Sequence, residues 1–365
     1  MIDTPRLNHN PYVGPRAFLR GETLYGRDRE VLELLDLLIA ERIVLLYSPS
    51  GAGKTSLIQA ALIPELEEES FEVLPAVRVS LEPPQPTVQG ANRYVMSILL
   101  SLEETVPSER QMPLDELATL TLNDYLERRD LARGTLGSLV LVFDQFEEIL
   151  TVDLAGQAAK SEFFEQLGRV LRDRGRWALF AMREEFLAGL DPYLRALPTR
   201  LDTTYRLELL GPGTALEAIQ QPARQAGVEF TDAAALKLVD DLRLVRVQLP
   251  DGATTEQPGP FVEPVQLQLV CRRLWDSLRP GTAKFTEADI SAVGDVDSAL
   301  AAYYADLVDA VAVETGITER AIRDWFDGQL ITEQGIRGQV LQGREQSGGL
   351  DNRAICPLVL SLIHI

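Results

Sequence analysis

The sequence predicts an α/β fold in which a parallel sheet is followed by a helical subdomain and a partial winged-helix domain. Three observations predict it: short, wholly apolar runs in the first 210 residues, helical patterns between these runs, and a loss of the strand signal beyond residue 210. Apolar runs of this length are typical of strands buried on both faces of a parallel sheet. Strands that alternate with helices imply right-handed crossover connections.

The predicted strands are the apolar runs, taken in chain order: Ile43–Tyr47, Val73–Val79, Leu139–Phe143, Trp177–Met182 and a weaker Thr204–Leu209. Pro75 interrupts the second run, so we expect that strand to be irregular. Between the runs, apolar spacing predicts a helix after the Gly26-Arg27-Asp28 turn and further helices over Leu57–Leu62 and Glu162–Leu171.

Beyond residue 210 the pattern becomes helical. We expect helices over Ala215–Ala226, Asp232–Leu242 and Pro264–Leu278, with a polar Pro/Gly loop near Pro250–Pro260. A third region has helical patterns at Ser298–Val313 and Glu319–Phe326, then strand-like pieces at Gln329–Ile331 and Gly338–Leu341. Helices followed by short strands in a small domain indicate a winged helix.

These patterns divide the chain into five parts. They are an irregular lead-in (1–23), the sheet domain (24–210), the helical subdomain (211–294), the partial winged-helix domain (295–359) and a short tail (360–365). The tail Leu360–Ile365 is what translation of a transposon-end sequencing adapter gives, so we expect it to be a scar and the natural protein to continue.

Composition excludes several classes of protein. The net charge of −20 argues against a broad nucleic-acid or anionic-membrane surface. No apolar run reaches the roughly 18 residues of a membrane span, and the charged N-terminus is not a signal peptide. Cys271 and Cys356 are too few and too far apart for a disulfide framework or a zinc site, so we expect a reducing cytoplasm. Two histidines leave catalysis to carboxylates, Lys, Arg and backbone groups.

The strongest motif is Ser48-Pro-Ser50-Gly51-Ala52-Gly53-Lys54-Thr55-Ser56, which lies between an apolar strand and an apolar helix. It resembles the Walker A loop G-x-x-x-x-G-K-[ST], with Ser48 in place of the first glycine. Glycines let the backbone form a nest of N–H groups around phosphate oxygens, and the helix N-terminus adds positive potential. Lys54 would neutralise phosphate charge, and the Thr55 hydroxyl would ligate Mg²⁺. The alternative is a Gly-rich helix entry with a surface lysine.

A second motif, Leu139–Phe143 followed by Asp144-Gln-Phe-Glu147-Glu148, has the form of a Walker B strand. A buried strand that ends in an acid can deliver a carboxylate to Mg²⁺ beside the P-loop. We therefore expect Asp144 on the metal side and Glu147 and Glu148 near the attacking water. The alternative for the Glu pair is a solvated helix start.

Together these motifs resemble the STAND-class P-loop ATPases, specifically the bacterial novel-STAND group related to NACHT domains. The resemblance covers nearly the whole sequence and includes five further stretches: Asn10–Phe18, Leu24–Glu30, Arg183–Phe186, Gln221–Arg224 and Val262–Trp275.

The resemblance implies further roles. Gly26 and Arg27 would line the adenine side of the site, Arg183 would sense the γ-phosphate, and Pro264 would pack on the base. Each has a plain alternative: a helix-start ion pair for Arg27, a surface position for Arg183, and a first-turn proline for Pro264. The sequence departs from the family pattern at Ser48 and at Gln145, which follows the Walker B acid and indicates slow hydrolysis.

The expected function is a cytoplasmic regulatory ATPase switch that exchanges ADP for ATP with Mg²⁺ and self-associates when ATP is bound. The resemblance implies sensor repeats beyond residue 365 and a role in bacterial signalling or phage defence. A nucleotide-locked scaffold without hydrolysis remains an alternative, and a small-molecule kinase is a weaker one. DNA binding through the winged helix is disfavoured by the acidity.

Overall fold

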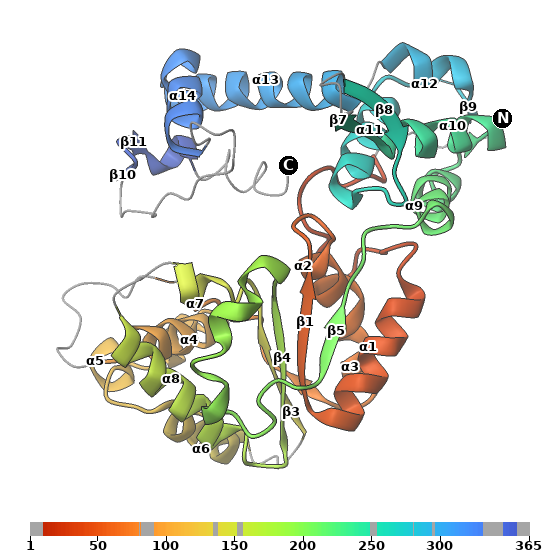
Figure 1. The fold of residues 1–365 in the computed structure, drawn as a ribbon. Helices are drawn as coiled ribbons and strands as arrows, with labels where there is room; N and C mark the ends of the chain where they lie inside the picture. Colours follow the sequence, from red (N-terminus) through yellow and green to blue (C-terminus); the bar gives the residue numbers. More distant parts are fainter. Residues whose placement is uncertain are drawn as a thin grey trace. The chain divides into compact units, whose positions relative to one another are not determined.

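The computed structural model describes residues 10–79, 81, 91–133, 138–151, 156–248, 254–279, 281–293, 296–330 and 346–355 (Figure 1). The chain forms two compact units, which are described separately. The sheet unit comprises Phe18–Ser50 and Lys54–Glu208. The helical unit comprises the described residues from Leu209 onward and residues 10–17, and Gly51–Gly53 group with it.

The sheet unit is built on a five-stranded parallel sheet in the order β2-β3-β4-β1-β5. The strands are β1 (Ile43–Ser48), β2 (Glu72–Val73), β3 (Leu139–Phe143), β4 (Arg176–Arg183) and β5 (Thr204–Arg206). The predicted α/β fold and the three apolar strands β1, β3 and β4 are confirmed. β2 stops before Pro75, and beyond it a single bridge joins Val77 to Phe143, so the expected irregularity is also confirmed.

Helices cover both faces of this sheet (Figure 1). One group holds α1 (Asp28–Glu41) and a continuous helix made of α2 (Lys54–Ser56), a π-helical segment (Leu57–Leu62) and α3 (Ile63–Glu68). The other group holds α4 (Arg93–Glu103), α5 (Leu114–Leu117), α6 (Leu122–Arg133), α7 (Glu148–Thr151) and α8 (Gln157–Val170). Three 3-10 segments lie at Ser108–Arg110, Glu184–Leu190 and Leu194–Ala196.

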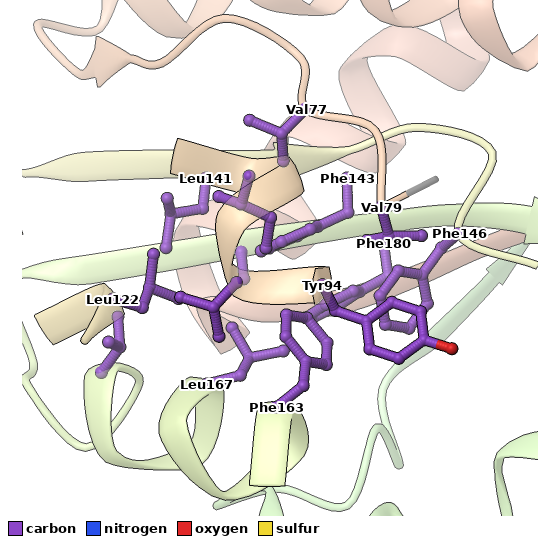
Figure 2. Close-up of a cluster of buried hydrophobic side chains, with 14 of the residues drawn as sticks. Val77, Val79, Tyr94, Leu122, Leu141, Phe143, Phe146, Phe163, Leu167 and Phe180 are labelled. Atoms are coloured by element: carbon purple, nitrogen blue, oxygen red, sulfur yellow. The ribbon is translucent and has the colours of Figure 1, made fainter. Parts of the chain in front are cut away.

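Aromatic and aliphatic side chains fill the space between the sheet and the second group of helices (Figure 2). Phe143 of β3 stacks on Phe180 of β4 with ring centroids 4.7 Å apart, and Phe146 contacts both rings. Phe163 of α8 packs against Tyr94 of α4. Full burial of such a side chain contributes about 1.5–3 kcal/mol, so this cluster holds the loop after β3 firmly against β4.

The helical unit contains α9 (Pro212–Gln225), α10 (Asp232–Leu242), α11 (Pro264–Asp276) and α12 (Glu287–Val293). Their apolar faces meet in one core that includes Cys271 and Trp275. Tyr12 also belongs to this core: it is 1% exposed, its ring meets Trp275 edge-on, and its hydroxyl donates to the Ile219 carbonyl. The segment expected to be an irregular lead-in therefore supplies a core residue of this unit, although its described residues, 10–23, form no helix or strand.

One prediction for this region is wrong in part: the loop expected near Pro250–Pro260 contains β8 (Thr254–Pro258), which pairs antiparallel with β7 (Leu244–Gln248). A second small sheet, which was not predicted, pairs β6 (Glu229–Phe230) with β9 (Lys284–Phe285) in parallel. Main-chain pairing between short strands forms these sheets, and their side-chain patterns are too short or too polar to reveal it.

The last described region has its own small core around Val308, Val311 and Ile322. It contains α13 (Val296–Thr315), α14 (Glu319–Trp325), a π-helical segment (Phe326–Leu330) and the hairpin of β10 (Gln346–Ser347) and β11 (Leu350–Asp351). Gln329 and Leu330 are helical, so the strand expected at Gln329–Ile331 is wrong there. Gly338–Leu341 and the tail Leu360–Ile365 lie outside the described residues.

Candidate functional site

Polar residues end the three central strands of the sheet at the same edge. Ser48 ends β1 and is paired in register with Arg183, the last residue of β4. Asp144 directly follows β3, the neighbour of β4 on its other side. Because all three strands are parallel, their carboxyl ends meet at one edge, which is where ligands bind in open α/β sheets.

The loop after β1 has the backbone of a phosphate-binding nest. Gly51 and Gly53 adopt left-handed φ angles of 77° and 92°, a conformation that residues other than glycine rarely adopt. The next residue, Lys54, begins α2, and its Nζ donates to the Ser48 hydroxyl at 2.7 Å. Burial lowers the pKa of Lys54, while the nearby Glu147 and Asp144 carboxylates oppose that shift. An ammonium has three donors, so this lysine can bind an anion as well as Ser48.

Thr55 and Asp144 form the second part of the site. The Thr55 hydroxyl donates to Asp144 Oδ2 at 2.8 Å, and the Gln145 backbone N–H donates to Oδ1 at 2.9 Å. Asp144 is 7% exposed. Mg²⁺ is held in proteins by oxygen donors and needs only one or two of them from the protein, and a hydroxyl and a carboxylate held together can supply these. The pair therefore fits the predicted metal side of the site.

Glu147 and Arg183 form the third part. Glu147 is 7% exposed, and its Oε1 lies 3.2 Å from Arg183 Nε. Its other oxygen, Oε2, is buried and has no hydrogen-bond partner among the described residues. Burial raises the pKa of Glu147, while Lys54 and Arg183 oppose the shift and Asp144 adds to it. A buried carboxylate with one free oxygen can accept a proton from a ligand or a water.

The structure shows that Glu147 and Glu148 have different surroundings, which the sequence alone could not distinguish. Glu147 lies in the turn before α7, within the field of Lys54 and Arg183. Glu148 is the first residue of α7 and is only partly buried, and its backbone N–H donates to the Gln145 carbonyl. An acid in the first turn of a helix is favoured by the helix dipole alone, so the position of Glu148 needs no ligand to explain it.

Gly26 and Arg27 lie immediately before α1. Gly26 has a φ of 75°, and Arg27 is 4% exposed. The Arg27 guanidinium pairs with Glu30 at 3.0 Å and donates to the Glu208 carbonyl at 2.8 Å. Burial lowers the pKa of Arg27, and Glu30 opposes that shift. Arg27 therefore ties the start of α1 to the chain that leaves β5.

The remaining predicted residues have the following places. Ser50 precedes Gly51, and Ala52 lies between the two glycines of the loop. The Ser56 hydroxyl accepts a hydrogen bond from the Phe18 backbone N–H at 3.1 Å, which anchors the start of the sheet unit on the P-loop helix. Pro264 is the first residue of α11 in the helical unit.

The sequence did not predict three features of the site. Ser48 supplies a hydroxyl acceptor to Lys54, and its place in the glycine position of the motif was the available signal. Gln145 adopts a left-handed φ of 53°, which turns the chain between Asp144 and Glu147. The Glu208 carbonyl receives Arg27, and a main-chain acceptor has no signature in the sequence.

In the part of the chain that the structure describes, no group of three or more His, Cys, Asp or Glu side chains could hold a metal ion by itself. In the same residues, no helix is both long enough and apolar enough to span a membrane.

The chain is similar to one family of known sequences and to several solved structures. The family model for novel STAND NTPase 1 matches residues 11–331. Among solved structures, the Walker-type ATPase PABY2304 of Pyrococcus abyssi is similar at 14% identity and a TM-score of 0.51, over 94% of this chain and 98% of that one. The ORC2 protein of Aeropyrum pernix, solved as ADPNP and ADP complexes, is similar at 14% identity and a TM-score of 0.50, over 92% and 86%. No curated protein matches this sequence.

The sheet order, the loop after β1 and the acid after β3 define an α/β protein of the P-loop NTPase class, and the two solved structures share its fold. The chain belongs to the novel STAND NTPase 1 family. The resemblance that the motifs carried is thereby confirmed over most of the sequence.

Proposed function

We propose that this STAND-type NTPase binds adenine nucleotide at the carboxyl edge of the sheet and hydrolyses ATP slowly. Its nucleotide state would control self-association in signalling or defence. One observation carries the proposal: Lys54, the Thr55–Asp144 pair and the Glu147–Arg183 pair gather where three parallel strands end. The ORC2 structure, a complex with ADPNP and ADP, supports adenine nucleotide as the ligand.

Each residue has a role that follows from its charge and place. The backbone of Ser50–Gly53 and the Lys54 ammonium would bind the β- and γ-phosphates. Thr55 and Asp144 would hold Mg²⁺, which when bound neutralises phosphate charge. Glu147 would orient the attacking water and accept its proton, since its free oxygen is buried among cations. Gly26 and Arg27 would lie on the adenine side of the site, with Pro264 as a further contact to the base.

The slow rate is inferred from the turn after β3. Gln145 follows the Walker B acid, and the buried acid comes three residues after Asp144. Arg183 also pairs with that acid. Glu147 must therefore either act on water while it is still paired or first turn away from Arg183. A switch gains from slow hydrolysis because each nucleotide state then lasts long enough for subdomains to rearrange.

The first test is the nucleotide content of freshly purified protein, released by denaturation and identified by chromatography. Near-stoichiometric ADP would support a closed switch. An empty site that binds and hydrolyses added ATP would support an ATPase that does not retain ADP. Bound nucleotide with no turnover would favour the locked scaffold. A chain that binds no adenine nucleotide would overturn the proposal.

The matched variants are Lys54→Ala and Lys284→Ala. Loss of the P-loop ammonium removes the cation that faces Asp144 and Glu147, so ATP affinity should fall by about 100-fold or more, the loss of one charged contact worth about 3 kcal/mol. Lys284 is 63% exposed in the helical unit and pairs with Glu229 at 3.4 Å. Its replacement should leave affinity unchanged, as measured by isothermal titration calorimetry.

A further inference from the structure

The turn after β3 that carries Glu147 is closed by successive backbone hydrogen bonds. The carbonyls of Gln145, Phe146 and Glu147 each accept the N–H three residues further on, at 3.0, 3.2 and 2.9 Å. Bonds of this kind make a tight, 3-10-like backbone. Glu147 therefore lies inside a hydrogen-bonded unit, and the direction of its side chain depends on how that unit leaves the strand.

The turn is also fixed to the neighbouring strand β4. The Phe146 backbone N–H donates to the Ala181 carbonyl at 2.9 Å. The Phe146 ring is fully buried against Phe143 and Phe180, as Figure 2 shows for the labelled rings. Because both the main chain and the ring of Phe146 are held, the chain must change direction between the end of β3 and this residue.

Gln145 makes this change of direction. Its φ is 53°, a left-handed value that is uncommon in residues other than glycine and costs about 1–3 kcal/mol. Its backbone N–H donates to Asp144 Oδ1 at 2.9 Å, which helps to hold the conformation. Ser70 has a similar φ of 68°, but it lies just past the end of helix α3, where left-handed residues are common. Gln145 follows a strand, so no helix end accounts for its conformation.

The Gln145 side chain does not account for the strain either. The residue is partly buried, and in the described part of the chain its side-chain amide forms no hydrogen bond. Arg42, another left-handed residue, differs because its guanidinium donates to three backbone carbonyls. At Gln145 the feature that the fold uses is therefore the backbone conformation, and its consequence is the placement of the turn with Glu147.

We infer that Gln145 is a positioning residue for Glu147, and that its strained backbone, rather than its side-chain amide, sets the position of the carboxylate. The inference rests on the proposed function and deepens it. A carboxylate that accepts a proton from water must lie within hydrogen-bond reach of that water, and a displacement of about 1 Å can cost about 100-fold in rate. A change in φ at Gln145 displaces the turn as a unit, and Glu147 moves with it.

Substitutions at Gln145 that differ in their tolerance of a left-handed backbone test this inference in the full chain. Single-turnover ATP hydrolysis is measured, together with ADP affinity in the absence of Mg²⁺. Gln145→Gly and Gln145→Asn change the side chain but accept a left-handed φ, so the rate constant should stay within about threefold of the wild type. Gln145→Val is β-branched and opposes this φ, so the rate constant should fall by about 10- to 100-fold. ADP affinity should stay within about twofold in each variant, because the loop Ser50–Lys54 is unchanged.

The matched control is Ser70→Val, which places the same residue at the left-handed position after α3. It should lower stability and leave the rate constant of the folded protein unchanged. Gln145→Thr is also β-branched and takes the place of Gln145→Val if that variant does not bind ADP.

Three results would overturn the inference while the wild type still hydrolyses ATP. One is an unchanged rate constant in the β-branched variant. Another is an equal loss in Gln145→Gly, Gln145→Asn and Gln145→Val, which would make the amide itself the active group. The third is an equal loss in Ser70→Val, which would make the effect one of stability alone. A wild-type chain that does not hydrolyse ATP would instead overturn the proposed function.

Discussion

The carboxyl edge of the sheet and the core of the helical unit both bury polar groups, and the comparison shows two different uses of burial. At the sheet edge, Lys54, Asp144 and Glu147 keep charges in a partly desolvated place, which costs several kcal/mol per ion unless charges pair. In the helical unit, the Tyr12 hydroxyl donates its hydrogen bond to the Ile219 carbonyl, and the Cys271 side chain is buried in the apolar core. The first arrangement is suited to a charged ligand, and the second stabilises the fold.

The largest expected effect is on the rate of ATP hydrolysis, and it comes from a change at the edge of the sheet. Glu147→Gln removes the proton acceptor but keeps the size of the side chain, so ATP hydrolysis should fall by about 10²- to 10⁴-fold. Glu148→Gln, the matched change one residue on, should alter the rate less than about threefold because Glu148 is less buried than Glu147 and begins α7, where the helix dipole favours an acid. Steady-state phosphate release measures both. A larger loss with Glu148→Gln would reverse the assignment.

The corresponding change in the helical unit should affect stability and leave the site alone. Tyr12→Ala removes a fully buried ring that packs against Trp275, so the free energy of unfolding of that unit should fall by about 3–5 kcal/mol. Tyr12→Phe loses only the hydroxyl contact and should cost about 1 kcal/mol. Urea denaturation followed by tryptophan fluorescence measures both, with ADP affinity as the control.

Cys271 gives an independent readout of the same core. Burial raises the pKa of its thiol, so little thiolate forms at neutral pH and alkylation should be slow in the wild type. In Tyr12→Ala the rate of iodoacetamide labelling at Cys271, followed by peptide mass spectrometry, should rise by about tenfold or more as opening becomes easier. Unchanged labelling together with unchanged stability would show that the N-terminal segment does not support this unit.

The sequence predicted the sheet edge better than the helical unit, for a physical reason. Buried parallel strands require continuous apolar runs, so β1, β3 and β4 were found, and the chemistry of the P-loop requires Gly53, Lys54 and Thr55 in a fixed order. β6 and β9 are two residues each and 55 positions apart, and no local pattern links them. Pairings such as Arg183 with Glu147 depend on which strands are neighbours, which the sequence does not record.

The pH dependence of hydrolysis tests whether the Glu147 carboxylate at the edge of the sheet is desolvated. Burial raises the pKa of Glu147, and the ionised form is the proton acceptor. Activity should therefore be lost as the pH falls through a pKa above the 4.5 of an ordinary glutamate, about tenfold per pH unit below it. Removing the cation with Arg183→Met should move this limb to higher pH. An acid limb at or below the ordinary value would mean that Glu147 is not buried as an acceptor.

The smallest expected effect concerns Ser48, where the motif departs from the glycine of its family. Its hydroxyl accepts a hydrogen bond from Lys54 and donates one to the Pro49 carbonyl, so it holds the lysine without supplying charge. An ammonium with three donors can keep this contact while it binds phosphate, so Ser48→Ala should loosen Lys54 and weaken ATP binding by about fivefold, or ~1 kcal/mol. Calorimetric titration with ATP measures the change, and Ser50→Ala is the matched control on the same loop. Tighter binding in Ser48→Ala would mean that the serine competes with phosphate for Lys54, which would make it a brake on the site.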